Sequence, residues 1–143
     1  KDIYFLGFQS NPYFFMSNSN ILVHSSLWEG LPNVIIESMI CGLPIISSDC
    51  KSGPRELLSS FMDLEYMPSK MQFVNGGILM PTPLISKNHQ GINRRNQRLW
   101  GEVMHLVIKH EKKLKSQKEY NYKKAQHFSS KKIITKWSKL IAN

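Results

Sequence analysis

Four short runs of apolar residues along the first part of the chain predict the strands of a sheet. They cover residues Ile3–Phe8, Asn20–Ser25, Pro44–Ser48 and Ile78–Met80. The first run is almost continuously apolar, which is typical of a strand buried on both faces of a parallel sheet. The last run follows the glycine-rich turn Asn75–Gly77, which marks where the chain reverses before that strand.

Three helical segments are predicted between these runs. Asn11 offers a side-chain oxygen for capping and precedes a proline at the first helical position, so we expect a helix over Pro12–Ser17. A mostly apolar helix is expected over Val34–Cys41, closed by Gly42, because glycine readily takes the left-handed conformation that ends a helix. The order of small residue, proline and glutamate in Ser52–Leu58 predicts the start of the third helix.

The remainder of the chain is predicted to be helical. Apolar residues recur at a spacing of three to four residues at Leu99, Val103, Leu106, Val107 and His110, and again at Ile133, Trp137, Leu140 and Ile141 behind a Ser129–Ser130 cap. The lysine-rich stretch between these two helices is expected to be solvated.

The alternation of strands and helices predicts an α/β protein with a partial Rossmann-like parallel sheet, followed by C-terminal helices. We place the α/β core in residues 1–86 and the basic helices, packing on the same domain, in residues 87–143. A sheet of this class binds ligands at the carboxyl ends of its strands. The loops that follow the strands are therefore where binding residues are expected.

The composition agrees with one compact domain. The chain has 143 residues, 41% of them apolar, which excludes a disordered tail, a collagen or a low-complexity linker. The longest apolar stretch, Val34–Ile46, is interrupted by Glu37 and Gly42, so no membrane span is predicted. The chain starts at Lys1 with neither an initiator Met nor a basic-then-apolar leader, so we expect it to be part of a longer polypeptide.

The two cysteines, Cys41 and Cys50, lie in or beside apolar segments and lack the spacing of a metal site. This pattern is typical of reduced thiols in a cytosolic protein, with a single disulfide as the alternative. We expect both thiols to be free.

The net charge of +9 comes from the C-terminal part of the chain. Residues 1–86 hold four basic and seven acidic side chains, whereas residues 87–143 hold fifteen basic and three acidic ones. Basic clusters at residues 94–98 and 112–115 can face water, an anionic membrane or nucleic acid. Lysine greatly outnumbers arginine, which disfavours bidentate readout of bases, so nucleic acid ranks last of these partners.

The segment Trp28–Glu37 carries the strongest functional pattern. Glu29 falls in the loop after a predicted strand, Gly30 allows close backbone approach, and Pro32 begins the helix that contains Glu37. Free amides at a helix N-terminus attract anions, and a carboxylate one or two turns further can accept hydrogen bonds from sugar hydroxyls. A phosphorylated sugar would satisfy both groups, although two glutamates at this spacing are also common as a loop residue and a solvated helix residue.

The order of motifs around this segment resembles the retaining glycosyltransferases of family 4, which have the GT-B fold. The family pattern is a strand ending in F-L-G, a strand ending near Ser, an E-x7-E motif, a G-x-P-V-I segment and an acidic residue in the next helix. The matching residues are Phe5–Gly7, Ile21–Ser25, Glu29 with Glu37, Cys41–Ile46, Ser48–Asp49, Ser52–Glu56, Gly76–Pro81 and Phe128–Ser129. The sequence of Gly7–Pro12, together with Ser52–Glu56, looks like that of the bacterial branch that adds N-acetylhexosamines or hexoses to lipid-linked glycans and surface polysaccharides.

The resemblance implies a role for each matching position. Glu29 corresponds to the first glutamate of the motif, which contacts the donor-sugar hydroxyls and is assigned as catalytic. Glu37 corresponds to the second, which holds the ribose of the nucleotide. The backbone expected to bind sugar or diphosphate oxygens is that of Gly30, Leu31, Pro32 and Asn33. The residues expected near the base or at the pocket wall are Phe8, Gln9, His24 and Ser25.

The resemblance also implies substrates and a cellular location. The donor would be a nucleotide diphosphate sugar, most commonly linked to UDP, used without a cofactor or metal because helix amides and cations take the role of the metal. The acceptor would be a glycan or a polyprenyl-linked glycan, met in the cytoplasm or at the inner face of the plasma membrane. The acceptor domain and the diphosphate-neutralising cations would precede Lys1, so we expect the chain alone to be inactive. The alternative is a basic α/β module that binds nucleic acid or a membrane surface without catalysis.

Several single residues have two interpretations. His24 is expected to be a hydrogen-bonded wall residue rather than an acid or base. Arg55 reaches either a phosphate or a neighbouring carboxylate in a surface ion pair. Trp28 is expected to pack at the cleft rather than stack on a sugar. Glu102 and His105 have metal-ligand spacing on a helix, but the further ligands of a carboxylate-bridged site are missing.

Overall fold

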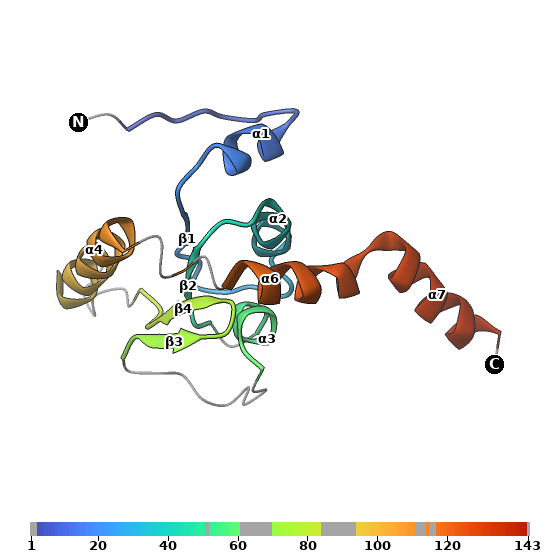
Figure 1. Ribbon diagram of the computed structural model, residues 1–143. Coiled ribbons are helices and arrows are strands. Elements are labelled where there is room, and N and C mark those ends of the chain that lie inside the picture. The colour runs from blue at the N-terminus through green and yellow to red at the C-terminus, as the bar shows by residue number, and fades with distance from the viewer. Residues whose placement is uncertain are drawn as a thin grey trace.

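The computed structural model describes residues 3–50, 52–60, 70–83, 94–110, 114 and 117–142. This part of the chain forms a four-stranded sheet with helices on both faces, as Figure 1 shows, so the predicted α/β fold class is confirmed. The strands are β1 (Leu22–His24), β2 (Ile45–Ser48), β3 (Gln72–Val74) and β4 (Gly77–Met80). Their order in the sheet is β1-β2-β4-β3, in which β1, β2 and β4 are parallel and β3 is antiparallel to β4.

Alternating side chains of the central strands fill two separate cores. Ile45 of β2 and Leu79 of β4 face one cluster of buried residues, whereas Ile46 and Ile78 face the other. In the register of the sheet, Ile46 pairs with Ile78. Both central strands are buried on both faces, which explains why apolar residues stand next to one another, without alternation, in Ile45–Ile46 and Ile78–Met80.

In the described part of the chain, three helices contribute to the core on the first face of the sheet and one to the core on the second. Figure 1 shows helices on either side of the sheet. On the first face lie α2 (Asn33–Cys41), α3 (Pro54–Leu58) and α6 (Gln117–Ala125). The second face is covered by α4 (Arg94–Lys109), whose Trp100 donates its indole N–H to the carbonyl of Pro81 at 3.2 Å. The result is a three-layer arrangement in which part of the loop after β1 is exposed, whereas Asp49, Cys50 and Gly53 after β2 are buried.

Two helices lie outside these layers. Helix α1 (Pro12–Ser17) follows an extended N-terminal arm and packs beside α2, where the hydroxyl of Ser38 contacts the sulfur of Met16 at 3.8 Å. Helix α7 (Ser130–Ile141) follows the short 3-10 helix η1 (Gln126–Phe128) and projects away from the sheet in Figure 1. It contains no buried residue.

The helices predicted from the sequence are present, and Gly42 closes α2 at a φ of 73° as expected. The predicted side-chain caps are wrong, because neither Asn11 nor Ser129 makes a side-chain cap hydrogen bond. The predicted inward face of α4 is confirmed in part. Val103 and Val107 are buried and Leu99 packs against the same core, whereas Leu106 and His110 are exposed and Trp100, which was not predicted, is buried.

The prediction of a buried strand over Ile3–Phe8 is wrong. This segment is extended but pairs with no described strand, and its side chains are exposed, with Phe5 at 97% and Phe8 at 94%. A strand is stabilised by hydrogen bonds to a neighbour as much as by its side chains. The apolar pattern of this segment shows that it can be buried, but not that the partner strand lies within these residues.

Strand β3 and the packing of helix α6 were not predicted. Strand β3 forms a hairpin with β4 around the predicted turn, although its sequence is only three residues long and half-exposed. Helix α6 occupies part of the lysine-rich stretch that was expected to be solvated, and this expectation is wrong for its inner side. Asn121 and Ala125 are buried there, and Asn121 donates to the carbonyl of Gly76 at 3.0 Å.

Cys41 and Cys50 are both free thiols, as predicted. Among the described residues, no helix combines the length and the hydropathy that a membrane crossing requires.

Candidate functional site

The parallel strands β1 and β2 end side by side, and the loops that follow them lie at the same edge of the sheet. The loop after β1 contains residues 25–32 and carries Glu29. The loop after β2 contains residues 49–53. In α/β folds this edge is where ligands bind, and the structure places the predicted residues Glu29 to Asn33 there.

The side chain of His24, at the end of β1, links the loop after β1 to strand β2. Its Nδ1 lies 3.0 Å from Oγ of Ser47 on β2, and its Nε2 lies 3.0 Å from Oε1 of Glu29. The hydroxyl of Ser26 is 3.1 Å from the same Nε2. The side chain of His24 is 8% exposed and that of Glu29 is 25% exposed. The cluster therefore joins a buried imidazole to a partly exposed carboxylate.

The carboxylate of Glu29 is stabilised in its ionised form. A hydrogen bond from the hydroxyl of Ser26 and the neighbouring imidazole of His24 hold the pKa of Glu29 below its usual value, against a smaller opposing effect of burial. At neutral pH this side chain is an acceptor of hydrogen bonds only. It is therefore suited to bind hydroxyl or N–H groups of a ligand.

The backbone of the Glu29 loop is fastened to the loop after β2. The hydroxyl of Ser52 donates to the carbonyl of Glu29 at 2.5 Å, and that of Ser48 donates to the carbonyl of Ser26 at 2.5 Å. Gly53 has a φ of 85°, and a Cβ at this position would lie 2.4 Å from the carbonyl oxygen of Gly30. Only glycine fits this close approach, so the two loops are held in one arrangement.

The N-terminus of α2 points out of the same edge. Pro32 is buried at the cap position, and no side chain caps the first turn within the described part of the chain. Gly30, Leu31 and Asn33 are exposed around it. Uncapped amides at the start of a helix carry a partial positive charge that attracts anions.

Glu37 lies in the second turn of α2, about 6 Å along the helix axis from Asn33. Its side chain is half-buried and has no hydrogen-bond partner among the described residues. A half-buried carboxylate without a protein partner has its acceptor capacity available for a ligand.

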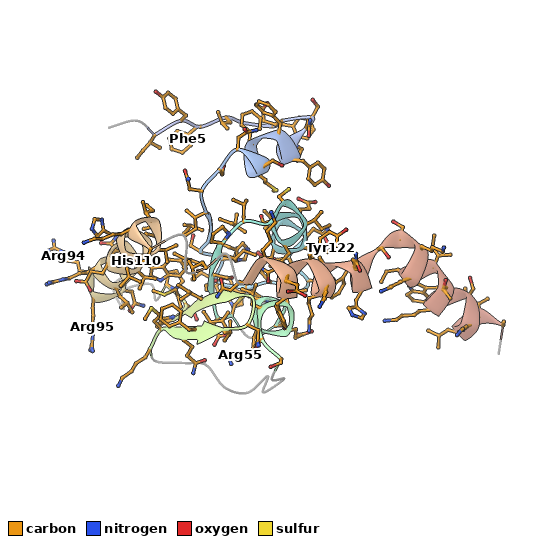
Figure 2. All side chains as sticks on the ribbon, viewed as in Figure 1. Phe5, Arg55, Arg94, Arg95, His110 and Tyr122 are labelled. Carbon is orange, nitrogen blue, oxygen red and sulfur yellow. The ribbon has the colours of Figure 1, made fainter. Side chains whose placement is uncertain are left out.

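The structure does not bring all the predicted residues together. Ser25 is exposed beside His24 at the end of β1. Phe8 and Gln9 lie on the N-terminal arm, where the amide of Gln9 donates to the carbonyl of Leu6 at 2.7 Å. Figure 2 shows this arm, marked by Phe5, apart from the sheet. These two residues are therefore not part of the Glu29 cluster in this structure.

Arg55 takes a different place from either predicted one. It is 7% exposed, and its Nε donates to Oδ1 of Asp49 at 2.9 Å while Nη2 donates to Oδ2 of Asp49. Nη2 also contacts Oε1 of Gln72 on β3 at 3.2 Å. The expected surface ion pair is thus a buried one that joins the end of β2 to α3 and β3. Figure 2 shows Arg55 in this region.

Burial dominates the electrostatics of the loop after β2. It raises the pKa of Asp49, although the hydrogen bonds from Arg55 act in the opposite direction, and it raises the pKa of the Cys50 thiol. The only sequence signal for this pair was an aspartate directly after a predicted strand, six residues before an arginine. That signal did not show whether Arg55 would bind a phosphate or pair with a carboxylate, nor which carboxylate it would pair with.

The remaining single-residue expectations fall outside the cluster. Trp28 is 80% exposed, so it does not pack in the cleft as predicted. Glu102 pairs with Arg98 at 2.8 Å on the exposed side of α4. No group of three metal-ligating side chains occurs in the described part of the chain.

Comparison with known proteins identifies related sequences. Residues 1–63 match the family model described as glycosyl transferases group 1. An uncharacterized glycosyltransferase of Methanocaldococcus jannaschii, MJ1059, is 36% identical over 99% of this chain. The N-acetylgalactosamine-N,N'-diacetylbacillosaminyl-diphospho-undecaprenol 4-alpha-N-acetylgalactosaminyltransferase of Campylobacter jejuni is 42% identical over 40% of it. The chain spans only 36% and 16% of the lengths of these two proteins.

A solved structure shares the fold. The crystal structure of Alr3699/HepE from Anabaena in complex with UDP aligns over 96% of this chain and 31% of its own, with a TM-score of 0.69 at 18% sequence identity. The parallel-dominated sheet with its C-terminal helices thus has the same fold as the matching part of this Anabaena protein. The family match covers β1, α2 and β2, which carry the Glu29 cluster and Glu37.

Proposed function

We propose that this chain is the donor-binding part of a retaining glycosyltransferase that transfers a hexose or an N-acetylhexosamine from a nucleotide diphosphate sugar. The observation that carries the proposal is the Glu29 carboxylate, held ionised at the carboxyl edge of the sheet within the segment that matches the glycosyl transferases group 1 model. A longer polypeptide would supply the acceptor-binding part, in line with the larger size of the relatives.

Each donor group has a matching element in the site. We assign the sugar hydroxyls to the carboxylate of Glu29 and the diphosphate to the exposed N-terminus of α2 around Gly30 and Asn33. The ribose hydroxyls are assigned to Glu37, whose carboxylate has no hydrogen-bond partner among the described residues. In this arrangement helix amides meet the negative charge of the leaving diphosphate, so a metal is not required for that role.

The nucleotide and the acceptor are part of the same proposal. The Anabaena neighbour was solved with UDP, which supports a uridine nucleotide as the first choice. The name of the Campylobacter relative states a diphospho-undecaprenol-linked acceptor, which supports a polyprenyl-linked glycan. Such a substrate would be met at the cytoplasmic face of a membrane.

Two glutamate variants test the proposal through the division of roles between them. The full-length protein is titrated with UDP, GDP and ADP by calorimetry, and transfer is measured with UDP-sugars. Glu37→Ala should weaken the affinity for one nucleoside diphosphate about 10-fold or more, because a charge-assisted hydrogen bond is worth roughly 1.5–3 kcal/mol. Glu29→Ala should mainly reduce transfer. Glu119→Ala, an exposed glutamate on α6, is the matched control and should change neither.

The possible results separate clearly. The proposal is supported if the parent protein binds one nucleoside diphosphate, Glu37→Ala weakens that binding, and Glu29→Ala preserves it. Equal loss of nucleotide affinity in both variants contradicts the division of roles. No binding of any nucleoside diphosphate by the parent protein refutes the donor site itself.

A second function, contact with an anionic membrane surface, is favoured by α7. Its apolar side chains Ile134, Trp137, Leu140 and Ile141 are between 61% and 80% exposed. They share one side of the helix, while the lysines at positions 131, 132, 136 and 139 lie on the other, with no acidic residue between Ser130 and Ile141. A helix of this pattern can lie in a lipid interface with its lysines near anionic headgroups.

Vesicle sedimentation tests this second function. The protein should bind vesicles that contain phosphatidylglycerol more strongly than pure phosphatidylcholine vesicles, and Trp137→Ser together with Leu140→Ser should abolish the difference. Equal partition of the parent protein between the two kinds of vesicle contradicts it. The substitution Leu106→Ser, at an exposed apolar position of α4, controls for a general loss of apolar surface.

A further inference from the structure

His24 connects the candidate carboxylate to the interior of the sheet. Both of its ring nitrogens have partners, because Nδ1 lies 3.0 Å from Oγ of Ser47 and Nε2 lies 3.0 Å from Oε1 of Glu29. Ser47 is fully buried on β2. A largely buried ring that is held from both sides cannot turn without losing a hydrogen bond, so its orientation is fixed relative to the sheet.

The chemistry of these partners determines where the ring protons lie. The ionised carboxylate of Glu29 accepts hydrogen bonds only, so Nε2 of His24 carries a proton and donates it to Glu29. The hydroxyl of Ser47 can donate to Nδ1 when the ring is neutral. When the ring is protonated, the same oxygen accepts from Nδ1 while its hydrogen turns to the carbonyl of Ser48, 3.1 Å away. The network is therefore complete in both forms of the ring.

The backbone and the side chain of Glu29 are held by different groups. The hydroxyl of Ser52 fixes the carbonyl of Glu29, and Gly53 packs against the carbonyl of Gly30, so the course of the loop does not depend on His24. The direction of the carboxylate does depend on it, because the N–H of His24 and the hydroxyl of Ser26 are the groups that surround it.

From this geometry we propose that His24 is a positioning residue, which orients the carboxylate of Glu29 toward the donor sugar while Ser47 anchors the ring to β2. The inference rests on the proposed function, because that function assigns Glu29 to the sugar. Glu37 and the N-terminus of α2 lie outside this network. Loss of His24 should therefore reduce the rate of transfer and leave the affinity for the nucleotide nearly unchanged.

Four variants of the full-length protein test the inference. His24→Leu removes both hydrogen bonds, His24→Gln keeps an amide N–H that can reach Glu29, and Ser47→Ala removes only the anchor. His127→Leu makes the same change at an exposed histidine in η1 and is the matched control. For each variant, kcat and KM are measured with UDP-N-acetylglucosamine and UDP-galactose, and the Kd of UDP is measured by calorimetry.

We expect His24→Leu to lower kcat about 10- to 100-fold, the loss typical of a hydrogen bond to a charged group, with the Kd of UDP within about twofold of the parent value. His24→Gln should recover a large part of kcat, and Ser47→Ala should fall between the two. An unchanged kcat in His24→Leu overturns the inference. A Kd that rises in parallel with the fall in kcat also overturns it, because that result indicates a general disturbance of the site.

A second measurement does not depend on catalysis or on the folding of a variant. Nitrogen chemical shifts of ¹⁵N-labelled histidine rings report which ring nitrogen carries the proton. For His24 of the parent protein we expect a protonated Nε2, and an unprotonated Nε2 would overturn the inference. Failure of the proposed function has a different signature, namely a parent protein that binds no nucleoside diphosphate.

Discussion

Replacement of Arg55 by methionine isolates the contribution of the buried ion pair beside the site. The change leaves the carboxylate of Asp49, which is 1% exposed, without the two hydrogen bonds from Arg55. Methionine keeps much of the apolar volume of the arginine stem, so the cavity created is small. What is measured is therefore the cost of an uncompensated buried charge, together with the smaller loss of the contact between Arg55 and Gln72.

The expected loss is large. Removal of one partner of a buried ion pair typically costs about 3–5 kcal/mol, and a whole domain is stable by roughly 5–15 kcal/mol. Arg55→Met should thus bring the domain near the limit of its stability. The matched control is Arg98→Met, which breaks an ion pair with Glu102 on the exposed side of α4. A pair of that kind is worth about 0.3–0.5 kcal/mol.

The pH dependence of the unfolding free energy independently tests whether the ionised carboxylate of Asp49 destabilises Arg55→Met. Burial already raises the pKa of Asp49, and loss of Arg55 removes the hydrogen bonds that oppose this rise. An acid whose pKa is higher in the folded state binds its proton more readily when folded, so its contribution to stability falls as the pH rises through that pKa. The unfolding free energy of Arg55→Met should therefore recover as the pH is lowered from neutral toward the pKa of the unfolded aspartate.

Equilibrium urea unfolding, followed by circular dichroism, measures these differences. The double variant Asp49→Leu/Arg55→Met removes both charges and should be more stable than Arg55→Met alone, because the desolvation penalty disappears with the carboxylate. A loss below about 1 kcal/mol in Arg55→Met would refute the reasoning. A double variant no more stable than the single one would refute it as well, since the penalty would then not lie in the unpaired charge.

Three further outcomes are expected in the same unfolding assay. The pKa of Glu29 is lowered in the folded state, so its ionised form stabilises the protein at pH values above its usual pKa. This stability is lost as the pH falls through the lowered pKa. Glu29→Gln should therefore flatten the acid side of the plot of unfolding free energy against pH. Gly53→Ala should lower the unfolding free energy by roughly 1–3 kcal/mol, because the residue has a positive φ and the new Cβ would meet the facing loop. Its control, Gly101→Ala, has open space around it on α4 and should be neutral or stabilising. Equal effects of the two variants would contradict the close approach of the loops. Asn121→Ala should lose about 1–3 kcal/mol by leaving the buried carbonyl of Gly76 unpaired, and a loss near zero would show that this hydrogen bond does not hold α6.

The predictions that succeeded from sequence rest on local chemistry. Helix α2 was predicted from the apolar run Val34–Cys41 and from Gly42, whose left-handed conformation depends only on its immediate neighbours. The placement of Glu29 at the carboxyl edge followed from the order of strand, loop and helix. Both inferences need only a few consecutive residues.

The predictions that failed depend on partners far away in the sequence. The segment Ile3–Phe8 has the composition of a buried strand, but pairing is decided by a neighbour that the pattern does not name. Arg55 donates hydrogen bonds to Asp49 and Gln72, which lie six and seventeen residues away. His24 was expected to be a hydrogen-bonded or pocket-wall residue, and its hydrogen-bond partners are present in the structure. Its link to Ser47, 23 residues away, became visible only with the register of the sheet.

The two edges of the sheet, formed by β3 and β1, differ in how far they are covered. The amide of Gln117 reaches the carbonyl of Val74 at 3.3 Å, so this short outer strand is partly covered by α6. On the opposite side, β1 pairs with β2 but with no other described strand. Among the described strands, the outer edge of β1 is therefore open to pairing with a further strand, whether from the same polypeptide or from another. Such an addition would turn His24 from an edge position into an interior one, and the Glu29 cluster would then lie near the middle of a wider sheet.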